Sequence, residues 1–126
     1  MGIATQVAKE IGGGAGIFAT KTVDIKDDYG TVVKSYTAEV AVVYGDGDYD
    51  RFATLGNRAQ FQQIRVKIRG VNYEHVEFLA DTVRKTMTEK GYIPLSGIIG
   101  LEDIVLEDGS NKKQIALDYK VLTPFI

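Results

Sequence analysis

The chain has 126 residues, of which 44% are hydrophobic and 25% are charged, and these values are typical of one globular domain. Its 15 basic and 17 acidic residues give a net charge of -2, which favours neither a nucleic-acid nor a membrane partner, and no apolar run approaches the roughly 20 residues of a membrane span. The absence of cysteine and the single histidine, His75, exclude a disulfide framework, a thiolate nucleophile and a histidine-rich metal site.

The N-terminal third of the chain predicts a short helix followed by two strands. Apolar residues recur at helical spacing from Ile3 to Ile11, and the run Gly12-Gly13-Gly14 interrupts that period. The segments from Ile17 to Ile25 and from Thr31 to Tyr44 are rich in β-branched residues, and the turn-forming cluster Asp27-Asp28-Tyr29-Gly30 separates them. We therefore expect a helix, a strand, a turn and a second strand.

The segment from Gly45 to Ala59 has no hydrophobic period, and we expect it to form a long loop. A structureless loop of about 15 residues is uncommon in a compact domain and is usually functional or mobile. We expect this loop to dock on a neighbouring molecule during assembly and to become ordered only then. Its anchors would be its large apolar residues, Tyr49, Phe52 and Leu55.

Beyond that loop, apolar and polar residues alternate strictly from Gln63 to Arg69, which predicts a strand. Its basic side chains would point away from Ile64, Val66 and Ile68, toward a neighbouring subunit or the central passage of an assembly. Residues 58 to 69 carry four basic residues and no acid, whereas residues 101 to 108 carry four acids and no base. Such segregation favours association, and pairing of these charges within one sheet is the alternative. The basic residues are Arg58, Arg65, Lys67 and Arg69.

The strongest predicted element is a helix from Asn72 to Lys90, with Asn72 as its N-cap and Gly91 as its C-terminal stop. Phe78 falls almost opposite the apolar stripe of this helix, so we expect it to be exposed in the isolated subunit and to contribute to a subunit contact. Coverage of Phe78 by the N-terminal helix or a loop of the same chain is the alternative. The stripe spans roughly 120° and consists of Tyr73, Val76, Leu79, Ala80, Val83 and Met87.

The C-terminal part predicts a hairpin, with strands from Ile98 to Leu106 and from Gln114 to Leu122 and a turn that contains Asp108-Gly109. Taken together, the elements predict an α+β fold in which helices pack on one face of a single antiparallel or mixed β-sheet. No repeat or linker divides the chain, so we expect residues 1-126 to form one domain.

Two motifs suggest ligand chemistry without the context that such chemistry needs. Gly14 to Ala19 match the pattern G-x-G-x-x-A, but a dinucleotide loop leaves a strand and opens a helix, whereas here the predicted helix comes first. His75 lies in the first helical turn with no identified nucleophile or orienting carboxylate nearby. We therefore assign no catalytic residue and no cofactor, and we expect the protein not to be an enzyme.

The spacing of Asp46, Asp48 and Asp50 resembles the opening of a calcium loop. However, Arg51 replaces the turn glycine and Asn57 replaces the bidentate glutamate. We interpret this segment as a solvated acidic loop and expect no metal site there.

Three features of the second half of the chain occur in a recognisable order. They are the strand Gln63-Ile64-Arg65-Val66-Lys67-Ile68-Arg69-Gly70, the helix start Asn72-Tyr73-Glu74 directly after it, and the terminal hairpin with Asp108-Gly109. In this order and spacing, the stretch from Phe61 to Leu122, about half of the chain, resembles the minor capsid or tail terminator proteins of long-tailed bacteriophages.

This resemblance implies a structural virion protein located at the head-tail junction. Such proteins form a homo-oligomeric ring, typically of six subunits, that caps the tail tube, stops its polymerisation and joins the tail to the head connector. The implied partners are the tail tube protein and the head connector protein, with at most non-specific contact to DNA phosphates and no membrane. Met1 to Glu10 lack the features of a secretory signal, so we expect synthesis in the bacterial host cytoplasm.

Two alternatives remain open at this stage. The chain is a different head-tail joining protein of the neck, or it is a small ligand-binding α+β regulatory domain that uses the loop from Gly12 to Gly16 to bind an anion.

Overall fold

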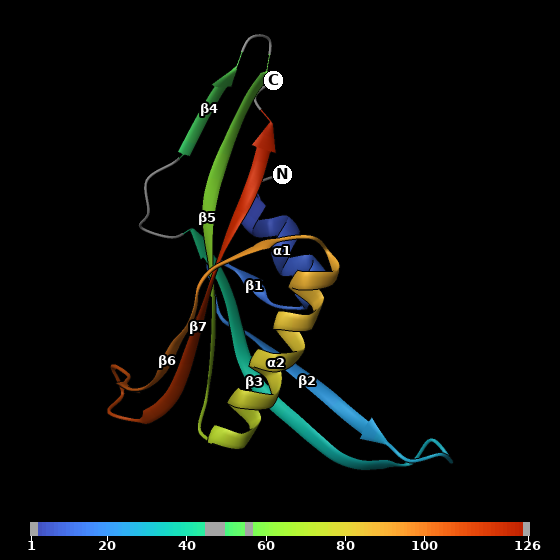
Figure 1. Cartoon of the computed structure of the whole chain (residues 1–126). Coiled ribbons are helices and arrows are strands. Elements are labelled where there is room, and N and C mark those ends of the chain that lie inside the picture. The colour runs from blue at the N-terminus through green and yellow to red at the C-terminus, as the bar shows by residue number, and fades with distance from the viewer. Residues whose placement is uncertain (1–2, 45–49, 55–56, 125–126) are drawn as a thin grey trace.

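The computed structural model describes residues 3-44, 50-54 and 57-124, which form a seven-stranded mixed sheet and two helices (Figure 1). This confirms the predicted α+β fold. In chain order the elements are α1 (Ile3–Ile11), β1 (Gly14–Ala15), β2 (Ala19–Lys26), β3 (Val32–Tyr44), β4 (Asp50–Thr54), β5 (Asn57–Gly70), α2 (Tyr73–Glu89), β6 (Ile93–Val105) and β7 (Asn111–Pro124).

The long strand β5 organises the sheet. On one edge it pairs with β7 from Ala59 to Gly70, and on the other edge it pairs with β3 from Ile64 to Arg69. The sheet order is β1-β3-β5-β7-β6, with β2 paired to β3 and β4 paired to β5. Every pairing is antiparallel except the short one between β1 and β3.

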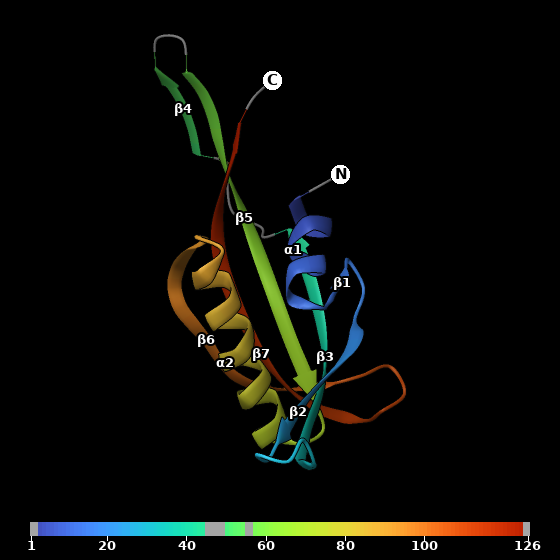
Figure 2. The ribbon, with the colours of Figure 1, turned by 90° about the vertical axis from the view of Figure 1, so that its right-hand side faces the viewer.

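Both helices cover the same face of this sheet, as Figure 2 shows. The alternation predicted for β5 is confirmed, because Ile64, Val66 and Ile68 point to the helices and are fully buried. They form the core with fully buried side chains of both helices and of β3, among them Val7, Val40, Val42, Val76 and Leu79.

Helix α2 begins and ends where its capping residues predict. The Asn72 side chain accepts a hydrogen bond of 2.9 Å from the Glu74 backbone amide, and Gly91 adopts a φ of 81° directly after the C-cap. The apolar stripe is buried as predicted except for Tyr73, which is 48% exposed. Tyr73 is the first residue of the helix, and the buried residues begin at Val76.

The prediction of a loop throughout residues 45-59 is wrong, since β4 and the start of β5 lie within it. The cause is backbone pairing, which the side-chain pattern did not reveal. β3 leaves the edge of β5 after the Tyr44–Ile64 pair, and β4 continues on that edge from the Asp50–Phe61 pair to the Thr54–Asn57 pair. Of the proposed loop anchors, Phe52 falls in β4, whereas Tyr49 and Leu55 lie outside the described residues.

Candidate functional site

The sheet face opposite the helices carries the basic side chains of β5. Arg65, Lys67 and Arg69 point to this face, as predicted, and each is half-buried. Lys67 lies between Ala41 of β3 and Ala116 of β7, and within the described part of the chain it forms no ion pair. Arg58 belongs to β5, where it pairs with Ala53 of β4. We call this surface, defined by Arg65, Lys67 and Arg69, the charged face.

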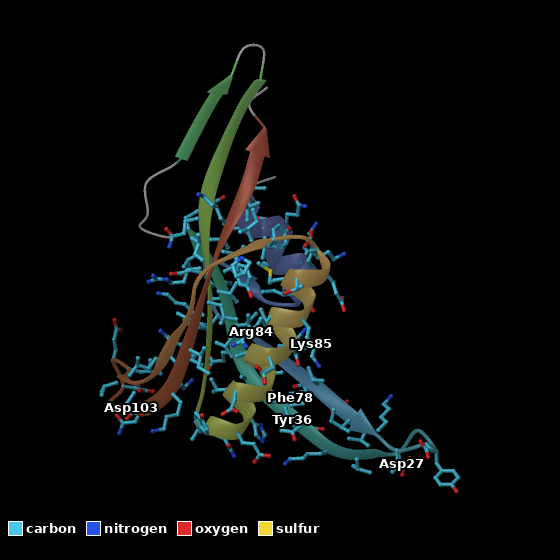
Figure 3. The ribbon with its side chains drawn as sticks, viewed as in Figure 1. Asp27, Tyr36, Phe78, Arg84, Lys85 and Asp103 are labelled. Carbon is cyan, nitrogen blue, oxygen red and sulfur yellow. The ribbon has the colours of Figure 1, made fainter. Side chains whose placement is uncertain are left out.

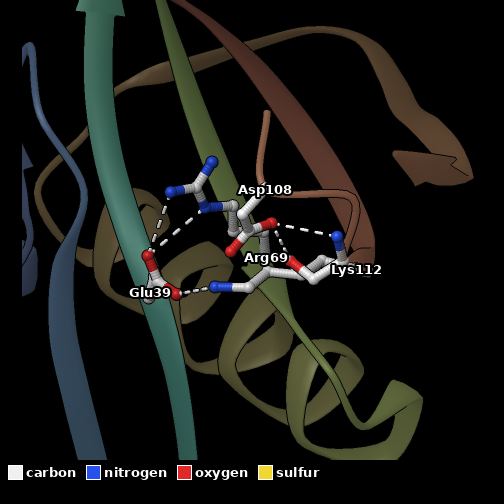
Figure 4. A network of polar contacts seen from close by, with 5 residues as sticks. Glu39, Arg69, Asp108 and Lys112 are labelled. Carbon is white, nitrogen blue, oxygen red and sulfur yellow. Dashed lines mark hydrogen bonds and ion pairs between the residues drawn. The ribbon is translucent and has the colours of Figure 1, made fainter. Parts of the chain in front are cut away.

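Two of the three cations are paired with acids on the neighbouring strands. Arg65 donates two hydrogen bonds, of 2.8 and 3.1 Å, to the carboxylate of Asp118, which is only 7% exposed. Arg69 bonds to Glu39 at 3.1 Å, and the same carboxylate accepts a bond from Lys112 (Figure 4). The pairing is therefore internal to the sheet for Arg65 and Arg69.

The ion pairs around Glu39 favour the ionised form of its carboxylate. The hydrogen bond from Lys112, followed by that from Arg69, lowers the pKa of Glu39 below its ordinary value although partial burial opposes this shift. The Arg69 guanidinium also lies 3.6 Å from the centroid of the Phe18 ring, in a cation–π contact. The charged face thus holds two groups of ion pairs, Arg65 with Asp118 and Arg69 with Glu39 and Lys112, on either side of Lys67.

The basic segment 58-69 and the acidic segment 101-108 do not lie on adjacent strands, because β7 separates β5 from β6. Asp103, at the end of β6, instead forms an ion pair with Lys113 of β7. The basic and acidic segments therefore do not pair with each other. The observed ion pairs join β5 to β7, β5 to β3 and β6 to β7.

Phe78 is not freely exposed, so this part of the prediction is wrong. It is half-buried against the core and stacks on Tyr36 of β3, with ring centroids 3.9 Å apart and planes 9° from parallel (Figure 3). Position on the helix did not reveal this contact, because Tyr36 lies in the part of β3 that extends past the end of β5. A contact of the remaining Phe78 surface with a neighbour stays a prediction.

His75 binds the backbone of β3 at its free edge. Its Nδ1 accepts a 3.0 Å hydrogen bond from the Thr37 backbone amide, at the position where β5 no longer pairs with β3. The ring also packs edge-on against Tyr36, with centroids 5.3 Å apart. His75 therefore supplies a hydrogen-bond acceptor to an amide at the free edge of β3.

The predicted turn at Asp27-Asp28-Tyr29-Gly30 is confirmed, since it joins the antiparallel strands β2 and β3, but the sequence did not reveal that this hairpin projects. The projecting part consists of β2, the turn at residues 27-31 and residues 32-37 of β3. We call it the arm. Residues 32-37 run past the end of β5, which at about 3.3 Å per residue is about 20 Å. Figure 1 shows the arm leaving the body of the domain, and its exposed apolar side chains are Ile25, Tyr29, Val32 and Val33.

The glycine-rich segment that suggested a ligand-binding loop has a structural role. Gly14 and Ala15 form β1, and the amides of Gly13 and Gly16 donate to the carbonyls of Ala8 and Val42, so these donors are already occupied. Within the residues that the structure describes, no group of three potential metal ligands occurs and no helix is long and apolar enough to cross a membrane. Asp46 and Asp48 lie outside that part of the chain.

Comparison with known proteins gives no assignment: no model of a protein family matches the chain, and no match is found among curated proteins.

Proposed function

We propose that this chain is a structural virion protein of a long-tailed phage, a tail terminator that forms a ring on the end of the tail tube. The ring, typically of six subunits, would cover the site where the next tube ring adds, stop polymerisation and offer its other side to the head connector. This mechanism is steric and needs no catalytic residue. The order of strand, helix and hairpin from Phe61 to Leu122 supports the proposal through its resemblance to this family.

The observation that carries the proposal is the arm. Its tip residue Tyr29 is 93% exposed, and Val33 is 61% exposed, at a distance from the domain core. A projecting hairpin with apolar side chains buries little surface within its own subunit, so its apolar area is available for contact with another molecule. A subunit of a ring needs such a contact on each side.

The charged face supplies the second support. On this face Lys67 lies between two alanines of the neighbouring strands, and Arg65 and Arg69, which flank it on β5, are held by internal ion pairs. The charge of Lys67 is therefore not neutralised by an ion pair with the described residues. In a ring, this face would line either the central passage or a subunit boundary. In the passage, Lys67 would meet transiting DNA through phosphates only and would read no sequence.

The test is to add the purified chain to the polymerising tail-tube protein of the same phage and to image the tubes by electron microscopy. We expect shortened tubes with a ring at one end, and native mass spectrometry of the ring should give its copy number. A variant in which residues 27-31 are replaced by a two-residue turn is the matched control. Tubes of unchanged length without a ring would reject the terminator function.

The same preparation separates the alternatives. Binding to the head connector with no effect on tube growth would identify a different joining protein of the neck. Saturable binding of a nucleotide in calorimetry would favour the small ligand-binding domain.

A further inference from the structure

The tip of the arm is a rigid turn that displays one acid and one aromatic ring. Asp27 Oδ1 accepts hydrogen bonds of 2.9 Å from the backbone amides of both Tyr29 and Thr31, and Gly30 closes the turn with a φ of 80°. The Asp27 carboxylate therefore stabilises the turn itself. The exposed Asp28 carboxylate, by contrast, has no hydrogen bond or ion pair with the described residues.

At the other end of the sheet, a cavity of about 330 Å³ lies between α2 and the strands β6 and β7. It sits at an irregularity of β6, where the pairing with β7 shifts between Pro94 and Ile98. Its walls combine apolar groups from Pro94, Leu95 and Leu117 with polar groups from Arg84, Thr88, Asp118 and Tyr119. The Asp118 carboxylate is already bonded to Arg65. We call it the Arg84 pocket.

The guanidinium of Arg84 has few hydrogen-bond acceptors within the described structure. Its Nη2 is buried and has no hydrogen-bond partner within the described structure, and its Nη1 lies 3.7 Å from Asp81 in a long ion pair. A buried donor without an acceptor costs free energy, which an incoming carboxylate would recover. Because the Arg84 side chain as a whole is 41% exposed, a rotation of the guanidinium can bring it to such a carboxylate.

Charge excludes the other described hollows as receptors for an acidic tip. The groove beside Phe78 is lined by Glu74, Glu77 and Asp81 and by no basic residue, so it offers no cation to Asp28. In the two hollows that Arg69 lines, its guanidinium is already bonded to Glu39. Of these sites, the Arg84 pocket alone offers a cation that lacks a close acceptor.

We propose that the Arg84 pocket receives the arm tip of a second copy of this chain, with the Asp28 carboxylate accepting hydrogen bonds from the Arg84 guanidinium. The Tyr29 ring then packs on the apolar walls of the pocket, as aromatic residues do at the centres of interfaces. This inference rests on the proposed function, since it requires that copies assemble.

The contact also explains how a ring closes. The tip belongs to the β2–β3 end of the sheet and the pocket to the β6–β7 end, so each subunit uses two different surfaces. A contact between two different surfaces is head to tail, and it generates a ring when the rotation between successive subunits closes on itself.

The first test is charge reversal, with assembly followed by analytical ultracentrifugation. Arg84→Glu and Asp28→Arg should each raise the dissociation constant by about tenfold to a hundredfold, the range of a hydrogen bond to a charged group. The double variant should restore assembly. The matched control is Lys85→Glu, because Lys85 is exposed and lies on the other side of α2 from Arg84 (Figure 3).

The second test is disulfide crosslinking, which is specific because the chain contains no cysteine of its own. A Thr31→Cys chain and a Thr88→Cys chain are mixed under oxidising conditions, and the disulfide between the two is identified by mass spectrometry. Val105→Cys, an exposed position in the β6 strand outside the pocket, replaces Thr88→Cys in the control mixture and should give no such product.

The outcomes distinguish the two proposals. An assembly that forms normally with either single charge reversal, and gives no crosslink between positions 31 and 88, overturns this docking but leaves the ring function standing. A chain that stays monomeric at every concentration and in the presence of tail tubes overturns both.

Discussion

Phe78 of α2 stacks on Tyr36 of β3, with ring centroids 3.9 Å apart, and this contact joins the long helix to the base of the arm. Three further contacts act at the same place. Thr37 donates to His75, Lys34 forms an ion pair with Glu74, and the Lys34 ammonium lies 4.9 Å from the Tyr36 ring centroid. The arm is therefore anchored on α2 where β5 no longer supports it.

Replacing Phe78 by alanine should lower the free energy of unfolding of the monomer by about 2 kcal/mol, less than the roughly 3–5 kcal/mol of a fully buried phenylalanine. The half-buried ring packs on Tyr36 within the same chain. Urea unfolding followed by circular dichroism measures the effect, and Tyr73→Ala, an exposed aromatic of the same helix, is the control. Weakened association with an unchanged unfolding midpoint would instead place the Phe78 contact on a neighbour.

The elements that the sequence predicted are those that depend on local signals. The helix from Asn72, the turn at Asp108-Gly109 and the alternation in β5 each follow from a cap, a turn residue or a period of two within a few positions. These signals need no knowledge of which strands are neighbours.

The features that were missed depend on strand order. Arg65 meets Asp118, 53 residues away, and Arg69 meets Glu39, 30 residues away, only because β7 and β3 flank β5. The strand β4 likewise exists because an edge of β5 is free beyond Ile64. Position on a helical wheel placed Phe78 correctly with respect to α2 but contained no information on the reach of β3.

Arg65→Gln should destabilise the monomer by about 2 kcal/mol, because it leaves the nearly buried Asp118 carboxylate without its two charge-assisted hydrogen bonds. The double variant Arg65→Gln, Asp118→Asn should be less destabilised than the sum of the two single variants. Thermal unfolding of all four proteins gives this coupling free energy. Strict additivity would show that the pair contributes nothing.

Lys67→Gln tests whether the Lys67 charge acts in the assembled ring without contributing to the stability of the monomer. Since Lys67 forms no ion pair in the described part of the sheet, the free energy of unfolding should change by less than about 0.5 kcal/mol. If the charged face lines the passage, the assembled ring should bind double-stranded DNA more weakly and with a smaller dependence on salt. Identical salt dependence for wild type and variant would remove Lys67 from the passage.

The stability of the protein should fall at alkaline pH through Tyr92. Burial, with a 2.9 Å hydrogen bond that the Tyr92 hydroxyl donates to Glu10, raises the pKa of Tyr92 from 10.0 to about 12. Between these two values the folded state keeps a proton that the unfolded state has lost, so the free energy of unfolding decreases as the pH rises. The contribution is complete below pH 10 and is lost as the pH rises through about 12.

Urea unfolding of wild type and Tyr92→Phe at several pH values measures this effect, since the difference between the two proteins removes the titration of other groups. The difference should be constant below pH 10 and shrink above it. A difference that stays constant up to pH 12 would mean that the Tyr92 pKa is not raised.

Gly30→Ala tests whether the shape of the arm tip matters for assembly. Gly30 has a φ of 80°, and a Cβ there would meet no atom within 4 Å, so the cost of about 1 kcal/mol is conformational strain of the turn alone. Gly109 in the β6–β7 turn has the same environment, with a φ of 85° and no atom within 4 Å, which makes Gly109→Ala a matched control.

Both variants should lower the melting temperature by a similar, small amount, because each strains one exposed turn. Only Gly30→Ala should weaken association, by about fivefold, since the strain would displace Asp28 and Tyr29 from the geometry that Asp27 holds in the free subunit. Ultracentrifugation of the two variants beside wild type compares them directly. If Gly109→Ala weakened association as much as Gly30→Ala, the loss would reflect general stability and the tip would have no special place in the contact.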